Sequence, residues 1–134
     1  MGEAGLTPGN NGSWYQDVPL AETTLSPTVA LQFRGGGGAV RLAYGRDVMV
    51  ATKRTGVGEV SVRASDVVFA GYGIVAPELG WNDYAGLDVR GKTVIVLVND
   101  PDWRAPLGQG AFGGRAMTYY GRWTYKHDEA ARQG

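Results

Sequence analysis

The chain has 134 residues, enough for one domain with its own core but too few for two. Its 13 basic and 13 acidic side chains cancel and neither sign forms a run, which argues against nucleic acid or an anionic membrane surface as a partner. Cysteine is absent, which excludes disulfides and thiolate chemistry, and no apolar run reaches the ~20 residues that a membrane span needs.

The amino-terminal half predicts a loose segment followed by short strands. Residues 1–12 are polar and rich in Gly and Asn, so we expect a flexible segment there and a single domain over residues 13–134. The segment has no apolar core of a secretory signal, which leaves the compartment open. Alternating runs at 28–33 and 39–44, joined by four glycines, predict a β-hairpin, and two further strands are expected at 47–52 and 59–63.

The four glycines at 35–38 also raise the question of a phosphate-binding loop. Such a loop needs a following Gly-Lys-Ser/Thr or a helix that opens directly after it, and neither is present. A flexible hairpin tip is therefore the favoured interpretation.

The carboxyl-terminal half predicts a more buried structure. Residues 65–75 form a continuous apolar run, typical of a strand in the middle of a sheet, and residues 92–100 predict a strand whose two faces are both apolar and both covered. Long loops are expected at 76–91 and 101–117. An amphipathic helix closes the chain, with Thr118 or Gly121 as its cap and an apolar stripe formed by Trp123, His127, Ala130 and Ala131.

A buried strand followed by a loop and a helix ordinarily continues into a second strand that lies parallel to the first. The sequence reaches no such strand, so we expect a sheet that stops before its return strand. Because an unpaired edge and uncovered apolar surface favour self-association, a homodimer or a swapped assembly is expected.

Several motifs carry a resemblance to a known family. The motifs GYGIVAP, WNDY, VRGK and TYYGRWTYK occur in this order in residues 66–103 and 114–134. These segments resemble the protease-associated domain inserted into di-zinc aminopeptidases, a family that includes bacterial leucyl aminopeptidase and glutamate carboxypeptidase. Residues 3–20 also resemble the part of this family that precedes the insertion.

The resemblance implies both a fold and a role. The implied fold is α+β and mostly β: a β sandwich or open barrel of the protease-associated type with one helix at the carboxyl end. The implied role is that of a module beside the active-site cleft, where loops 76–90 and 100–117 would act as a lid for peptide substrates. Its partners would be the peptide substrate or the missing peptidase domain, and zinc would belong to the parent enzyme.

The residues themselves argue against metal-dependent hydrolysis by this chain. A two-zinc site needs several His and carboxylate ligands, whereas His127 is the single histidine. We therefore expect no metal, no cofactor and no catalytic residue here. Two alternatives remain open: His127 could act as a general base with a carboxylate, although a packing role on the helix is favoured, and Asp100 and Asp102 could bind calcium, although a solvated turn is favoured.

Aromatic side chains in the second half are the strongest candidates for contact with a partner, because exposed aromatics bury a large area at small entropic cost. Packing is nevertheless the favoured interpretation for the set as a whole: Trp81 and Tyr84 would fix a loop to the sheet, and Trp123 would fill the core between helix and sheet. The expected function is a non-catalytic module that shapes substrate access or mediates protein interaction; the alternative is a free-standing β module that binds peptides or glycans. The candidate binding surface consists of Trp81, Asp83, Tyr84, Trp103, Phe112, Tyr119 and Tyr120.

Overall fold

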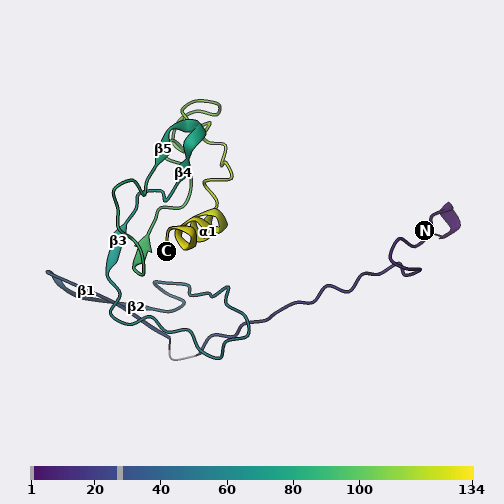
Figure 1. Ribbon diagram of the computed structural model, residues 1–134, viewed down its shortest axis with the longest axis horizontal. Helices are drawn as coiled ribbons and strands as arrows, with labels where there is room; N and C mark the ends of the chain where they lie inside the picture. The colour runs from purple at the N-terminus through teal and green to yellow at the C-terminus, as the bar shows by residue number, and fades with distance from the viewer. Residues whose placement is uncertain (1, 27–28) are drawn as a thin grey trace. The chain divides into compact units, whose positions relative to one another are not determined.

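The computed structural model describes residues 2–26 and 29–134 (Figure 1). The chain forms two compact units, Met1–Ser61 and Val62–Gly134, and each is considered by itself. All of the buried apolar side chains found in the described residues lie in the second unit. The prediction of one domain over residues 13–134 stays a prediction.

The first unit contains the expected hairpin. After a 3-10 turn η1 (Gly2–Ala4), strand β1 (Ala30–Gly35) pairs antiparallel with β2 (Gly38–Ala43), and Gly35 faces Gly38 at the tip. Leu31 and Phe33 alternate with exposed residues, as a period of two requires. The hairpin is therefore confirmed, although the predicted start at residue 28 lies outside the described residues.

The two further strands predicted after the hairpin are wrong. Within the described residues, 47–52 and 59–63 contain only an isolated bridge between Tyr44 and Val48. The Asp47 carboxylate instead accepts a hydrogen bond from the Ala43 backbone N–H at 2.9 Å and closes a turn directly after β2. A valine-rich segment has a high local preference for the strand conformation. It does not form a β-strand, however, when no neighbouring strand is available for hydrogen bonding.

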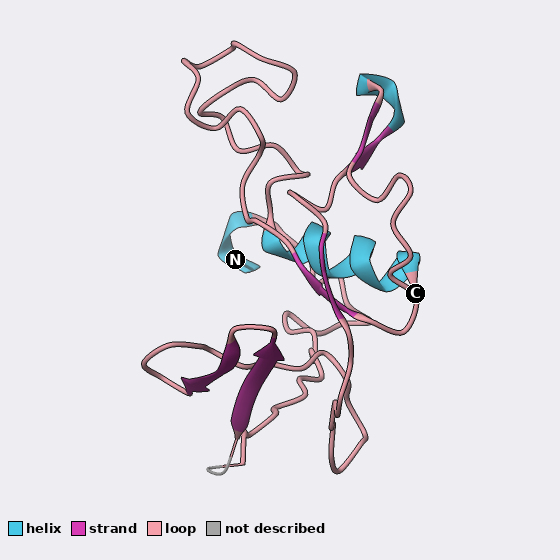
Figure 2. Cartoon of the chain, turned by 90° about the vertical axis from the view of Figure 1, so that its left-hand side faces the viewer, coloured by secondary structure: helices cyan, strands magenta, loops and turns pink. Residues whose placement is uncertain are grey.

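The second unit is built on a parallel strand pair. Strand β3 (Val67–Phe69) pairs with β6 (Thr93–Ile95), with Val68 opposite Val94. Helix α1 (Trp123–Gln133) lies next to this pair in both Figure 1 and Figure 2, with its axis crossing the strand direction. The Asn99 backbone N–H donates to the Gly121 carbonyl at 2.8 Å, which ties the chain beyond β6 to the segment that leads into the helix.

The apolar run at 65–75 is not one central strand, which corrects the sequence prediction. It is divided between β3 and β4 (Val75–Ala76), and β4 pairs antiparallel with β5 (Trp81–Asn82) across the short 3-10 turn η2 (Pro77–Leu79). Gly71 and Gly73, with φ of 52° and 60°, turn the chain between the two strands. This left-handed backbone conformation is open to glycine at no steric cost and breaks the ladder.

Two clusters of buried side chains form the core. One contains Ile74, Ala76, Phe112 and Tyr125; the other contains Ala70, Tyr84 and Val89, with Val94 and Val96 packed against it. The opposite face of the β3–β6 pair is uncovered, since Phe69, Ile95 and Leu97 are 58%, 42% and 46% exposed. The prediction that both faces of residues 92–100 are covered is therefore wrong.

Helix α1 differs from its prediction at its start and on its buried face. Arg122 stands at the N-cap position without a side-chain cap, so neither Thr118 nor Gly121 has that role. The buried residues are Tyr125, Lys126 and Glu129, whereas Trp123 is 65% exposed. With its strand pairs and this single α-helix at the carboxyl end, the described fold is small, α+β and rich in strands, and its strands form no closed barrel.

Candidate functional site

The seven predicted surface residues divide into exposed and buried side chains. Trp103 and Tyr119 are exposed, at 41% and 59%, whereas Phe112 and Tyr84 are buried, at 3% and 5%. Three others, Trp81, Asp83 and Tyr120, are partly buried. A role of this set in binding stays a prediction, but Trp103 and Tyr119 alone offer a large aromatic area in the conformation described.

Five of the aromatic rings in this unit form a connected cluster. Phe112 stands edge-on to Trp81 and to Tyr120, with centroid distances of 5.4 and 6.0 Å. Tyr120 and Tyr119 in turn meet the Tyr125 ring at 5.0 and 5.2 Å. Edge-to-face pairs of this kind add about 0.5–1.5 kcal/mol each beyond the area they bury. The cluster therefore joins the hairpin β4–β5, the loop after β6 and helix α1.

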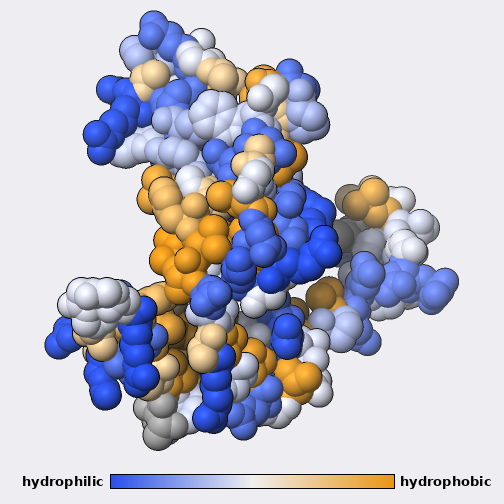
Figure 3. Space-filling model, turned by 60° about the vertical axis from the view of Figure 1, so that its left-hand side comes forward, coloured by the Kyte–Doolittle hydropathy of each residue, from blue (hydrophilic) through white to orange (hydrophobic). Residues whose placement is uncertain are grey.

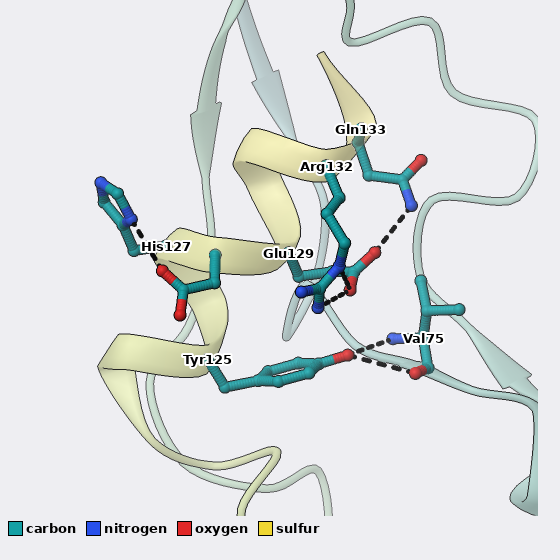
Figure 4. Close-up of polar contacts among 7 residues, drawn as sticks. Val75, Tyr125, His127, Glu129, Arg132 and Gln133 are labelled. Atoms are coloured by element: carbon teal, nitrogen blue, oxygen red, sulfur yellow. Dashed lines mark hydrogen bonds and ion pairs between the residues drawn. The ribbon is translucent and has the colours of Figure 1, made fainter.

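Tyr125 connects the helix to β4 through its hydroxyl group (Figure 4). The Tyr125 hydroxyl donates to the Val75 carbonyl and accepts from the Val75 N–H, both at 3.1 Å. Further along α1, the buried Glu129 carboxylate accepts hydrogen bonds from Arg132 and Gln133. These contacts satisfy the buried hydroxyl of Tyr125 and the buried carboxylate of Glu129.

A hydrogen bond to a residue outside the aromatic cluster also holds Tyr120 in place. Its hydroxyl group donates to the carboxylate of Glu78, which lies in η2. This hydrogen bond favours the ionised carboxylate and the protonated phenol, so it lowers the pKa of Glu78 and raises the pKa of Tyr120 to about 12. This hydrogen bond fixes the Tyr120 ring, which belongs to the segment before α1, against η2.

The loop of residues 100–117, which was expected to act as a lid, is anchored by carboxylates. Asp100 is fully buried; its two side-chain oxygens accept hydrogen bonds from the Thr118 N–H at 2.7 Å and the Thr118 hydroxyl at 2.9 Å. Asp102 accepts the N–H of Phe112 at 2.8 Å. These two residues are thus structural acceptors rather than members of a solvated turn, which corrects the favoured sequence interpretation.

Trp103 projects from this anchored loop. The Arg104 guanidinium lies over the Trp103 ring, 5.0 Å from the ring centroid, and forms a cation–π contact with it. An exposed aromatic ring next to a cation on a loop with fixed ends is a good contact surface, because little loop entropy is lost when a partner binds.

Asp83 and Tyr84, which follow β5, also have structural contacts. The Asp83 carboxylate accepts the Ile74 N–H at 3.0 Å, and the Asp83 N–H donates to the Ile74 carbonyl at 2.8 Å. Burial raises the pKa of Tyr84 to about 12, with the charge on Glu129 as a further cause. These contacts agree with the interpretation that Tyr84 fixes its loop to the sheet.

Sequence reasoning missed Lys126, a residue with an unusual environment. Lys126 is 3% exposed, and its ammonium group has no hydrogen-bond partner among the described residues. The group lies 5.7 Å from the centroid of the Tyr72 ring. Burial lowers its pKa to about 8, against the opposing charges of Asp100 and Asp83. The helical pattern gave no signal for it, because lysine on a helix is usually an exposed residue.

His127 does not pack against the core as expected. Its side chain is 53% exposed and pairs with the neighbouring Asp128 at 3.3 Å (Figure 4). Among residues 2–26 and 29–134, no group of three or more His, Cys, Asp or Glu side chains is placed to hold a metal ion. No helix in the described ranges has the length and apolar character needed to cross a membrane.

Comparisons with protein-family profiles, with curated proteins and with solved structures find no match for this chain.

Proposed function

We propose that the chain is a non-catalytic module of the protease-associated type, belonging to a zinc-dependent aminopeptidase, and that it shapes the access of peptide substrates. The motif order in residues 66–134 supports this proposal. A small strand pair covered by one helix is compatible with it. Zinc and the hydrolytic groups would then belong to the peptidase part of the enzyme.

The observation that carries the proposal is the combination of fixed and exposed groups in the loop of residues 100–117. Asp100 and Phe112 are buried at 0% and 3% exposure, while Trp103 between them is 41% exposed. The loop thus presents an aromatic ring to solvent from a fixed base. A peptide that contacts this surface can stack on the ring with little loss of conformational entropy in the loop, because the loop is already fixed.

Two exposed tryptophans allow a matched test of this contact. Titration with a library of short peptides is expected to give saturable binding that Trp103→Ala removes. Trp123→Ala serves as the control, since Trp123 is 65% exposed but lies on α1 outside the loop. Binding that depends equally on both tryptophans, or on neither, contradicts the assignment of the surface.

The non-catalytic part of the proposal has its own test. The chain incubated with zinc and aminoacyl anilides is expected to release no product above the rate without protein. Hydrolysis that appears with zinc and disappears with a chelator would show that the chain carries a metal-dependent active site of its own.

The second candidate is a free-standing module that binds peptides or glycans through the same aromatic loops. The Arg104 guanidinium beside the Trp103 ring favours a peptide with a carboxylate over a neutral glycan. Parallel peptide and glycan arrays distinguish the two ligand classes. Saturable glycan binding that is lost in Trp103→Ala would favour the second candidate over a role in a peptidase.

We also propose that the chain self-associates through the β3–β6 pair. Val67, Phe69, Ile95 and Leu97 leave one side of this pair apolar and exposed, and Figure 3 shows apolar groups exposed on the face that it draws. Light scattering over a range of concentrations is expected to detect a dimer that Ile95→Lys weakens and the loop control Leu107→Lys does not. A monomer at every concentration contradicts this proposal.

A further inference from the structure

Lys126 lies where two loops meet helix α1. The loop after β3 contributes the Tyr72 ring, whose centroid is 5.7 Å from the ammonium nitrogen. The loop after β6 contributes Asp100, and the residue that follows β5 contributes Asp83. Carboxyl ends of parallel strands bring such loops to one edge of a sheet.

Both carboxylates near Lys126 are also the acceptors that hold these loops. Asp83 holds the Ile74 N–H at 3.0 Å, and Asp100 holds the Thr118 N–H at 2.7 Å. Neither carboxylate forms a hydrogen bond with the ammonium group, which has no partner among the described residues. The protonated lysine is therefore a buried cation. It attracts the carboxylates of Asp83 and Asp100 but forms a hydrogen bond with neither of them.

A buried ammonium without a hydrogen bond costs much more free energy than a neutral amine in the same place. The structure gives this group no compensation beyond the Tyr72 ring and the two carboxylates. Other charged groups next to it on α1 have their own partners: His127 pairs with Asp128, and Glu129 pairs with Arg132. The charge on Lys126 is thus the one that the surrounding loops must accommodate.

We propose that Lys126, Asp83 and Asp100 form a pH-sensitive anchor, which holds the loops at residues 70–74 and 99–121 against α1 more tightly in alkaline than in neutral solution. The anchor operates whether or not the chain acts beside a peptidase. Loss of one proton removes the uncompensated charge while the backbone hydrogen bonds to the two carboxylates remain. Protonation restores the charge and favours opening of the loops, which lets water reach the ammonium.

The sign of the effect follows from proton binding in the two states. Burial lowers the pKa of Lys126 from its ordinary value of 10.5 to about 8. Between these values the unfolded chain binds more protons than the folded chain, so stability increases with pH. The unfolding equilibrium constant is expected to fall about tenfold per pH unit within this window. Tyr84, Tyr120 and Tyr125 oppose the trend as the pH approaches 10 and above it, because their pKa is raised, for Tyr84 and Tyr120 to about 12.

Urea unfolding of the whole chain from pH 7 to pH 10 tests the anchor. The wild type is expected to become more stable across this range, whereas Lys126→Met should be more stable at pH 7 and insensitive to pH. Lys126→Arg, which keeps its charge throughout, should be insensitive to pH and less stable than the wild type at pH 10. Lys92→Met is the control, because Lys92 forms an ion pair at 3.1 Å with the exposed Asp88 and should leave the rise in stability intact.

A second measurement keeps the test valid if a variant fails to fold. Lys126 can be followed by NMR through its ε-carbon and is expected to titrate near pH 8. The protection factors of the Ile74 and Thr118 amides should rise from pH 7 to pH 9.5. A wild type whose stability does not increase with pH overturns the proposal, as does a Lys126 ε-carbon that titrates near 10.5 or amide protection that does not change.

Discussion

At the scale of single residues, close packing makes Gly73 in the second unit sensitive to substitution. A Cβ atom at this position would lie 2.6 Å from Val96 Cγ1 and 3.1 Å from the Tyr84 hydroxyl, and φ is +60°. Gly73→Ala combines left-handed strain with overpacking, so we expect a loss of about 2–4 kcal/mol in the free energy of unfolding, measured in urea.

Gly80 provides the matched control for this prediction. Its φ of +64° is nearly the same, but a Cβ atom there would meet nothing within 4 Å. Gly80→Ala should therefore cost only the backbone strain, about 1 kcal/mol. Equal losses in the two variants would mean that Val96 and Tyr84 move aside and that packing at Gly73 is not restrictive.

At the scale of elements, one hydroxyl group joins helix α1 to strand β4. Tyr125 is 3% exposed and satisfies both the N–H and the carbonyl of Val75 at 3.1 Å. Tyr125→Phe would leave both backbone groups without a partner, so the expected loss is about 1–3 kcal/mol in urea unfolding. Tyr120→Phe is the control: its hydroxyl contacts the exposed Glu78, and a smaller loss is expected. A Tyr125→Phe variant as stable as the wild type would show that water replaces the hydroxyl.

A secondary-structure element can be predicted from the sequence when the residues that determine it lie close together in the chain. The β1–β2 hairpin was predictable because its alternation and its glycines lie within one short segment. The buried face of α1 was not, because Lys126 and Glu129 are buried by partners far away in the sequence or specific to this packing, such as the Tyr72 ring. A helical pattern counts hydrophobic residues and cannot show a polar residue that tertiary contacts bury.

The candidate site shows the same limit. Aromatic residues in the long loops were visible as a group, but the sequence could not separate Phe112, which enters the core, from Trp103, which remains exposed. The role of Asp100 was equally hidden, since its partner Thr118 is 18 residues away. Contacts across such a distance depend on the path of the whole loop rather than on local composition.

At the scale of the whole molecule, the distribution of buried side chains predicts that the second unit folds by itself. The buried apolar residues found in the described structure all lie between Ala70 and Tyr125, whereas the first unit has a two-stranded hairpin as its largest element. A hairpin of this kind is marginally stable alone. Residues 62–134 produced separately should therefore unfold in urea with the midpoint of the full chain, and residues 1–61 should show no cooperative transition.

Fluorescence separates the signals, because Trp14 belongs to the first unit and Trp81, Trp103 and Trp123 belong to the second. An equimolar mixture of the two pieces is the control: a higher midpoint in the mixture than in residues 62–134 alone would show that the units stabilise each other, and the second unit would then not be an independent folding module.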